Sequence, residues 1–278
     1  VVNAFRAYRN TNINKIHWNS AAMKDSNSRN RDYSWTFGNC QKIEHIYYDS
    51  PQRLIYWLTT VLKYNDYVLN NSNLTVNTAF LPFYNNIKTI EIGPNAKNIS
   101  STFSGYVRYY IDNANNNLYG TDVGGAYVGG NRLGGFPNII GGENVTNMAY
   151  AFASQYTLGE KIICGDLVTN AYAAYSGCSN SRIAKPVVGN SVVDARSMYS
   201  SCYGMGRNMN DNDIIPLRAS IKMPYYMYNN CGNMHGTIDK DNFLLMNVGT
   251  NHCNNMFANC INISNNSVFV VPQGTVNG

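Results

Sequence analysis

The sequence has few charged residues, no long apolar run and no concentration of positive charge. Asp, Glu, Lys and Arg make up 13% of its 278 residues, and the formal net charge is +5. Lys and Arg form no run or stripe, so we expect no nucleic-acid partner. No segment approaches the roughly 18 to 20 consecutive apolar residues of a membrane span, so we expect no membrane insertion. What remains is an uncharged polar surface, in which about one residue in six is Asn.

The sequence also lacks the common catalytic motifs. It contains no Gly-x-Ser-x-Gly nucleophile elbow and no glycine-rich loop ending in Gly-Lys-Ser or Gly-Lys-Thr. The acidic residues are scattered, and the pairs Asp211 with Asp213 and Asp239 with Asp241 fall in polar segments, where closing a turn is the simpler role. We therefore expect no enzymatic activity, no catalytic residue and no cofactor.

An eleven-residue phrase recurs along the chain, and its clearest copy is VTNAYAAYSGC at 168–178. Positions four, seven, eight and eleven of the phrase carry small, apolar or aromatic side chains. The spacing i, i+3, i+4, i+7 predicts a short helix with these side chains on one face. A helix of about two turns is unstable alone in water, so its apolar face must pack on neighbouring copies. Further clear copies begin at residues 1, 145, 192, 221 and 250.

Position eight of the phrase is aromatic in nearly every copy. Position seven is small or Met in the clearest copies, which suits close contact between neighbouring coils. An aromatic ring in the same slot of successive coils predicts a column of rings that anchors the core. The predicted structural anchors are Tyr8, Phe37, Phe83, Phe103, Tyr127, Phe152, Tyr175, Tyr199, Tyr228 and Phe257.

Five of the seven cysteines occupy position eleven of the phrase, which predicts a buried column of thiols that act as small apolar groups. Occasional disulfides between coils are the alternative if the column is exposed outside a cell. A zinc site built from Cys and His on adjacent coils is a third interpretation. The core role is simpler, so no metal ligand is assigned. The column is Cys40, Cys178, Cys202, Cys231 and Cys260, and the zinc alternative is Cys231, His235, His252, Cys253 and Cys260.

Short runs rich in β-branched residues lie between the phrases, in most units about six residues before the next copy. Gly, Pro or Asn bounds each run, as is typical of strands. One strand, one turn and one short helix in roughly 25 residues indicate a solenoid whose strands stack in parallel. The predicted strands cover 90–92, 138–140, 161–163, 186–188, 213–215, 243–246 and 268–271.

Two copies carry a family resemblance: V-T-N-M-x-x-x-F at 145–152 and A-x-x-M-Y-x-x-C at 195–202. They resemble the BspA-like leucine-rich repeats, and the resemblance covers most of the chain, most strongly from about 76 to 271. It implies a curved right-handed solenoid of the kind found in bacterial surface proteins and some phage proteins, with a role in attachment. Leu is scarce in this chain, and Tyr, Asn and Met fill many slots where the family more often has Leu.

The fold prediction is therefore an α/β repeat solenoid of the leucine-rich-repeat type, with about 10–11 coils. Short parallel strands form one face, and short helices or turns form the other. We expect a single elongated domain over 1–278, with irregular coils over 1–70 and regular coils over 71–278. Segment 50–69 has apolar residues at helical spacing and predicts an inserted helix. The chain begins with Val1 at position one of a phrase, so we expect it to be a fragment of a longer protein.

Tyrosine, with 22 residues, is the strongest indication of a binding surface. Several tyrosines lie in pairs outside the repeat slots, and Tyr offers a large rigid face with a polar tip. A half-buried position in a strand or helix is the alternative role for these pairs. Paired glycines within 120–142 indicate tight turns or a close backbone approach to a ligand. The predicted partner-binding residues are Tyr47, Tyr48, Tyr109, Tyr110, Gly124, Gly125, Gly129, Gly130, Tyr225 and Tyr226.

These observations favour a non-enzymatic recognition or adhesion module. We expect it on a phage particle, as a tail or capsid-surface fibre component, or on a bacterial cell surface, where it binds host glycan or protein. Its expected location is extracellular. The alternative is a purely architectural subunit of a virion or surface assembly, which contacts neighbouring subunits and has no host ligand.

Overall fold

A computed structural model describes residues 7–19, 36–37, 40, 42–51, 54, 88–103, 109–112, 117–120, 131–132, 138–154, 158, 162–179, 183–239, 253–265 and 267. The chain divides into two compact units. Unit 1 consists of Val1–Ala96 and Gly105–Gly141, and unit 2 consists of Lys97–Ser104 and Gly142–Gly278. The single elongated domain expected over 1–278 stays a prediction.

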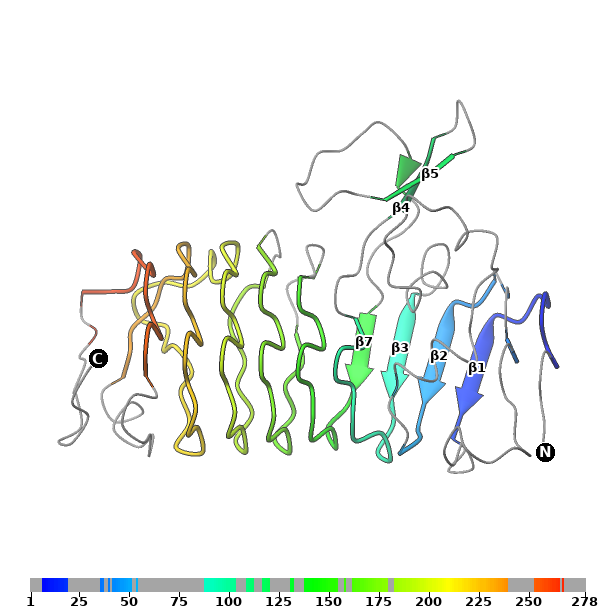
Figure 1. The fold of residues 1–278 in the computed structure, drawn as a ribbon, viewed down its shortest axis with the longest axis horizontal. Helices are drawn as coiled ribbons and strands as arrows, with labels where there is room; N and C mark the ends of the chain where they lie inside the picture. Colours follow the sequence, from blue (N-terminus) through cyan, green and yellow to red (C-terminus); the bar gives the residue numbers. More distant parts are fainter. Residues whose placement is uncertain are drawn as a thin grey trace. The chain divides into compact units, whose positions relative to one another are not determined.

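Four short strands form a parallel sheet in unit 1 (Figure 1), and they pair in the order β1-β2-β3-β7. Each neighbouring pair is in register over four residues. The strands predicted at 90–92 and 138–140 are confirmed, whereas β1 and β2 lie where the sequence predicts no strand. The bounds are β1 Lys15–Trp18, β2 His45–Tyr48, β3 Thr89–Ile92 and β7 Asn138–Gly141.

The side chains of this sheet alternate between a buried and an outward face, as the two-residue period of a strand requires. Ile16, Ile46 and Ile90 lie in register and are only 5%, 1% and 0% exposed. Burial of one such side chain stabilises the fold by about 1.5 to 3 kcal/mol. A second buried row lies two residues further along the strands and consists of Trp18, Tyr48 and Ile92.

A second sheet in unit 1 is antiparallel and departs from the all-parallel solenoid expected from the sequence. Its order is β5-β4-β6, with β4 at Tyr109–Asp112, β5 at Asn117–Gly120 and β6 at Asn131–Arg132. Only residues 113–116 separate β4 from β5, and so short a connection permits antiparallel pairing alone, because a parallel pair needs a crossover of a dozen residues or more. The Asn-rich 113–116, with tyrosines on either side, is the signal that predicts this hairpin.

The inserted helix expected at 50–69 falls almost entirely outside the described residues. The structure describes 50, 51 and 54 of this segment. Leu54 has helical backbone and is 0% exposed, so this apolar residue contributes to the core of unit 1.

In unit 2 the phrase folds as a series of turns, and the helix predicted for 168–178 is wrong. Positions six and ten have positive φ in each described copy, for example 50° at Ala173 and 75° at Gly177. Residues in this left-handed region do not continue a right-handed helix, so the phrase bends twice. The other residues at these two positions are Ser101, Tyr150, Ser154, Ser197, Ser201, Tyr226, Asn230, Asn255 and Asn259.

Hydrogen bonds between neighbouring copies hold these turns in a stack. We call a phrase together with the run that precedes it a coil. In the 168–178 copy, the N–H groups of Ala171, Ala173 and Tyr175 donate to carbonyls of the next coil at 2.8–2.9 Å. The intervening N–H groups at positions seven, nine and eleven donate within the coil, to the carbonyl three residues earlier. The amides at positions four, six, eight and ten thus join this coil to the next, and those at positions seven, nine and eleven close turns. The amide at position three bonds back to the Thr146 carbonyl of the preceding coil.

The runs that precede the phrases of unit 2 do not pair as regular strands. Residues 186–188 and the described part of 161–163 have no strand conformation, and 213–215 makes one isolated bridge, from Ile214 to Thr237. The strands predicted at 186–188 and in the described part of 161–163 are therefore wrong, and in both runs an anchor hydroxyl bonds to the backbone. The Tyr175 hydroxyl donates to the Ile163 carbonyl at 2.6 Å and accepts from the Ile163 N–H. The strands predicted at 243–246 and 268–271 lie outside the described residues.

Aromatic rings at position eight form a continuous column in the core of unit 2. Neighbouring centroids are 5.0–5.5 Å apart, and the planes of Tyr175, Tyr199 and Tyr228 differ by only 3–4°. Each stacked pair adds about 0.5 to 1.5 kcal/mol beyond the burial of its surface. In unit 1 Tyr8 stacks on Phe37 at 5.5 Å but remains 51% exposed. The column of unit 2 is Phe103, Phe152, Tyr175, Tyr199, Tyr228 and Phe257, whereas Phe83 and Tyr127 lie outside the described residues.

Thiols at position eleven form a second column beside the rings. The thiol of Cys202 donates to the carbonyl of Tyr175 at 3.0 Å, and that of Cys231 donates to Tyr199 at 3.1 Å. In each case the acceptor belongs to position eight of the preceding coil. Burial raises the pKa of Cys202 and Cys231 well above the ordinary value. These thiols therefore stay protonated and unreactive at neutral pH. The same contact recurs at Cys40, Cys178 and Cys260, and all described cysteines are free.

Candidate binding surface

In each of four successive coils of unit 2, position five or six of the phrase carries a large side chain that is exposed or half-buried. Backbone hydrogen bonds place these residues on four successive coils, from Tyr150 N–H to Tyr172 O, from Ala173 N–H to Arg196 O and from Ser197 N–H to Tyr225 O. Tyr150 and Tyr226 are 39% and 43% exposed, and the Arg196 side chain is 41% exposed. We name this set, Tyr150, Tyr172, Arg196, Tyr225 and Tyr226, the exposed aromatic row.

Three members of the row, Tyr150, Tyr172 and Arg196, contact one another across coils. The rings of Tyr150 and Tyr172 meet edge to face, with centroids 4.8 Å apart. The guanidinium carbon of Arg196 lies 4.7 Å from the centroid of the Tyr172 ring on the other side. A cation over an aromatic face at an exposed site contributes about 0.5 to 1 kcal/mol. Tyr172 is thus held between its two neighbours, so the row presents a defined surface.

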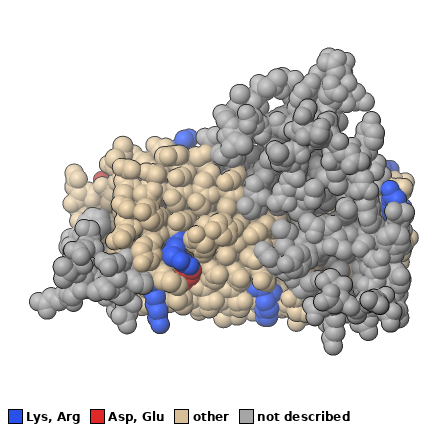
Figure 2. Space-filling view, viewed as in Figure 1, with Lys and Arg blue, Asp and Glu red and all other residues tan. Residues whose placement is uncertain are grey.

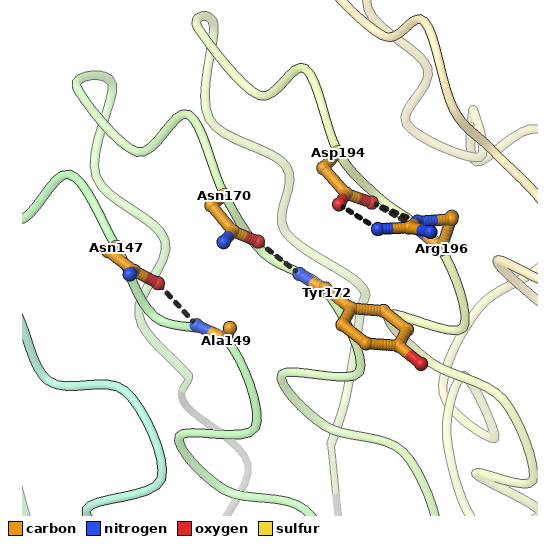
Figure 3. Close-up of polar contacts among 6 residues, drawn as sticks. All are labelled: Asn147, Ala149, Asn170, Tyr172, Asp194 and Arg196. Carbon is orange, nitrogen blue, oxygen red and sulfur yellow. Dashed lines mark hydrogen bonds and ion pairs between the residues drawn. The ribbon is translucent and has the colours of Figure 1, made fainter.

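Asn and Asp at position three fix the backbone from which the row projects. Asn147 accepts a hydrogen bond from the Ala149 N–H at 3.0 Å, and Asn170 accepts one from the Tyr172 N–H at 3.1 Å (Figure 3). Asp194 takes the same place one coil further on, with the Arg196 N–H at 3.2 Å. Each contact spans two residues and forms an Asx turn. Position three therefore sets the direction of position five in all three coils.

Asp194 also neutralises the single charge of the row. Its carboxylate accepts hydrogen bonds from Nε and Nη2 of Arg196 at 3.0 and 2.8 Å (Figure 3). These bonds raise the pKa of the Arg196 guanidinium above its ordinary value. A hydrogen bond with Tyr172 similarly raises the pKa of Tyr150. Tyr150 therefore stays neutral near pH 7, and the Asp194–Arg196 ion pair leaves this part of the row with polar groups but no net charge.

Two tyrosines of the row stand in a backbone conformation that disfavours bulky residues. Tyr150 and Tyr226 occupy position six with φ of 55° and 54°. The left-handed region costs an L-residue about 1 to 2 kcal/mol and is a true outlier for a large side chain. Ala173 and Ser197 fill the same slot in the intervening coils. Both tyrosines thus combine strained backbone with exposed rings, which is a feature of functional sites.

The structure distributes the predicted partner-binding residues over several environments. Tyr225 and Tyr226 belong to the exposed aromatic row. Tyr47 lies half-buried on the outward face of β2, where its ring is 4.3 Å from His17, and desolvation followed by the charges of Asp49 and Glu91 raises its pKa. Tyr48 is 0% exposed and belongs to the core of the sheet. Tyr109 and Tyr110 begin β4, whereas Gly124, Gly125, Gly129 and Gly130 lie outside the described residues.

Sequence reasoning missed three members of the row, Tyr150, Tyr172 and Arg196. Tyr225 and Tyr226 stand out in the sequence because they are adjacent in the chain. The other members become neighbours only in the folded chain, where backbone hydrogen bonds join one phrase to the next. Alignment of the copies by position is the signal that predicts them, since all five residues fall at positions five and six.

No grouping of three or more His, Cys, Asp and Glu side chains suited to a metal ion occurs among the residues that the structure describes. Of the alternative zinc ligands, Cys231 and Cys260 donate their thiols to backbone carbonyls, and His252 lies outside the described residues. Asp213 closes a turn by accepting from the Asn210 N–H at 2.9 Å, and it also pairs with Lys185. Its geometry fits the turn-closing role expected for that acidic pair.

Charged side chains are few on the described surface, and some of them lie in ion pairs, as Lys88 does with Glu44. Figure 2 shows Lys and Arg atoms at a few separate places among uncharged residues on the face in view, one of them beside an acidic side chain. Within the described ranges, no helix has the length and apolarity needed to cross a membrane. Comparison with protein-family models, curated proteins and solved structures finds no match to this chain. The exposed aromatic row is therefore the feature of this chain that bears most directly on its function.

Proposed function

We propose that this chain is a non-enzymatic recognition module that binds a host-surface glycan or protein through the exposed aromatic row. The observation that carries the proposal is the placement of Tyr150 and Tyr226. Both accept a left-handed backbone and remain 39% and 43% exposed, so neither gains full burial in return. A cost in stability that burial of the ring does not offset is reasonable where the ring meets a partner.

The composition of the row supports the same function. Tyr and Arg are the side chains most enriched at the energetic centres of binding surfaces. Tyr172 is packed between Tyr150 and Arg196, so it loses little freedom when a ligand arrives. A solenoid that resembles the BspA-like repeats, displayed outside the cell on a phage particle or a bacterial surface, provides a rigid support for such a row.

A binding experiment with whole cells tests this proposal. The purified chain, labelled with a fluorophore, is applied to a panel of bacterial cells and to a glycan array, and bound label is measured against concentration. We expect saturable binding to at least one surface, and loss of most of it in the double variant Tyr172→Ala, Tyr226→Ala. Tyr203→Ala is the matched control, because Tyr203 is 49% exposed and lies outside the row. The absence of saturable binding to every cell and glycan tested would refute the proposal.

An architectural role is the second candidate, and exposed aliphatic side chains in the runs of unit 2 favour it. Val187 and Ile214 are 38% and 47% exposed, and the ion pair of Lys185 with Asp213 joins their two runs. Apolar side chains of this kind suit contact with a neighbouring subunit. Sedimentation of the chain with and without Ile214→Asp tests the idea, since an architectural contact requires concentration-dependent association that the variant weakens.

A further inference from the structure

We propose that the ligand of the exposed aromatic row is an uncharged, extended glycan that lies along the stack of coils. This inference rests on the proposed recognition function and specifies its substrate class. Three features of the described residues carry it: the repeat distance between coils, the planar polar groups that each coil contributes, and the neutrality of the site.

The repeat distance of unit 2 suits a linear polymer of sugars. Successive coils place their anchor rings 5.0, 5.4 and 5.5 Å apart, from Phe152 through Tyr175 and Tyr199 to Tyr228. Each of the same coils contributes one or two members to the row, which therefore repeats at this distance. One pyranose ring of an extended glycan has a similar length. A periodic ligand meets a member of the row at each coil, whereas the surface of a globular protein has no such repeat.

The planar groups of the row suit the two kinds of surface on a sugar ring. The exposed rings of Tyr150 and Tyr226 can pack against the C–H groups of a pyranose, and phenol hydroxyls at the ring edges can bond to the hydroxyls of the sugar. Tyr172, which lies between Tyr150 and Arg196, holds both in place. Arg196 uses Nε and Nη2 for Asp194, and the other N–H groups of its five-donor fork can serve a ligand. The row therefore combines apolar planes with polar rims along its whole length.

The charge balance of the row selects an uncharged glycan. Arg196 is the only cation of the row, and the carboxylate of Asp194 lies within 2.8 Å of its guanidinium. An acidic polysaccharide would gain little from this compensated pair and would meet the charge of Asp194. Binding to an uncharged glycan, in contrast, needs no counter-charge and depends weakly on salt.

Titration with neutral β-linked oligosaccharides of one to six glucose or N-acetylglucosamine units tests the inference. We expect affinity to rise with each added sugar up to about four, because the row covers four coils, and then to level off. Tyr172→Ala and Tyr226→Ala should each weaken binding of the tetrasaccharide about tenfold. Tyr203→Ala should leave it unchanged, and Tyr172→Phe should retain most of it because the ring remains. Thermal unfolding of each variant shows that the fold is preserved.

The outcomes separate this inference from the function on which it rests. Affinity that is independent of length, equal binding by the Tyr172 and Tyr226 alanine variants, or binding to acidic polysaccharides alone would overturn the uncharged-glycan inference. If the chain binds cells through an envelope protein and binds no oligosaccharide, the inference fails and the recognition function stands. If it binds neither cells, proteins nor glycans, the recognition function fails as well.

Discussion

The two units use the same repeat but place their backbone ladders differently. In unit 1 the runs at β1, β2, β3 and β7 pair as a regular parallel sheet, whereas in unit 2 the runs are almost unpaired and the phrases carry the ladder. The anchors explain the difference. The first anchors after β3 and β7 in the sequence are Phe103 and Phe152, which lack a hydroxyl. The runs without strand pairing precede Tyr175 and Tyr199, whose hydroxyls bond to Ile163 and Val187 of those runs. The 213–215 run makes one bridge, and the Tyr228 hydroxyl bonds to the Pro216 carbonyl just after it.

In the coils of Tyr175 and Tyr199, the hydroxyl oxygen of the anchor thus occupies backbone hydrogen-bonding groups of the run. The hydroxyl of Tyr199 donates to the Val187 carbonyl at 2.6 Å and accepts from the Val187 N–H at 3.0 Å. A residue whose N–H already bonds to the hydroxyl has no donor with which to pair with a neighbouring strand. Tyr and Phe at position eight are therefore not equivalent, although both fill the core.

Removal of an anchor ring should have the largest effect on unit 2. Tyr199→Ala deletes a fully buried ring between two stacked neighbours. We expect a loss of about 3 to 5 kcal/mol in the free energy of unfolding, because the change leaves a cavity and breaks the column. Chemical denaturation followed by circular dichroism measures it, with Tyr203→Ala as the exposed control. A loss no greater than that of the control would contradict the role of the column.

Removal of the hydroxyl alone tests the comparison between the two units. Tyr199→Phe leaves the Val187 N–H and carbonyl without their partner, and we expect a loss of about 1 to 3 kcal/mol in the free energy of unfolding. Tyr228→Phe is the matched variant, because Tyr228 makes one such bond, to the Pro216 carbonyl at 2.8 Å. Its loss should be smaller. Hydrogen exchange at the Val187 amide should accelerate in Tyr199→Phe, and an unchanged rate would refute the explanation.

Loss of an Asx turn should have a smaller effect. Asn170→Ala removes the acceptor for the Tyr172 N–H, and we expect a loss of about 1 kcal/mol in stability. Asn170→Asp preserves the acceptor and is the control, since Asp194 has this role in the next coil. Denaturant titration measures both variants. Equal losses in the two would indicate that the amide group matters for another reason.

The smallest effect should be the pH dependence due to Asp213. Its hydrogen bond from Lys185, followed by that from the Asn210 N–H, lowers the pKa of the carboxyl below its ordinary value. The ionised form is thus favoured in the folded state. The resulting stability is present above the unfolded pKa of about 3.9 and is lost as pH falls through the lower folded value. Thermal unfolding between pH 5 and pH 2.5 should show a weaker decline in Asp213→Asn than in the parent chain.

The repeat register was sufficient to predict which residues share a column, but it did not predict the backbone between them. Alignment of the phrase places Phe152, Tyr175 and Tyr199 in one slot, and in the structure their rings stack. The turns were missed because Tyr, Ala and Ser fill the left-handed position six in most copies, where Gly or Asn is the usual signal. At position ten, Gly177, Asn230 and Asn259 carry that signal, but Ser154 and Ser201 do not.

The candidate site, too, could be predicted from the sequence only in part. Chain neighbours such as Tyr225 and Tyr226 are visible in the sequence, but the contact of Arg196 with Tyr172 depends on which face each coil turns outward. That direction follows from the Asx turns at Asn170 and Asp194 and from the two left-handed residues of each phrase. None of these can be read from apolar periodicity, which reports the buried positions alone.

The backbone hydrogen bonds of unit 2 also make several of its coils structurally equivalent. In the copies that begin at 145, 168 and 192, amides at positions four, six, eight and ten donate forward to carbonyls at positions three, five, seven and nine. These three junctions therefore make the same four backbone hydrogen bonds, whereas the copy at 221 has Pro224 at position four and lacks that donor. If one of these three coils were deleted or duplicated, each donor at the new junction would still meet an acceptor. The number of coils can therefore change while the packing within each coil stays the same.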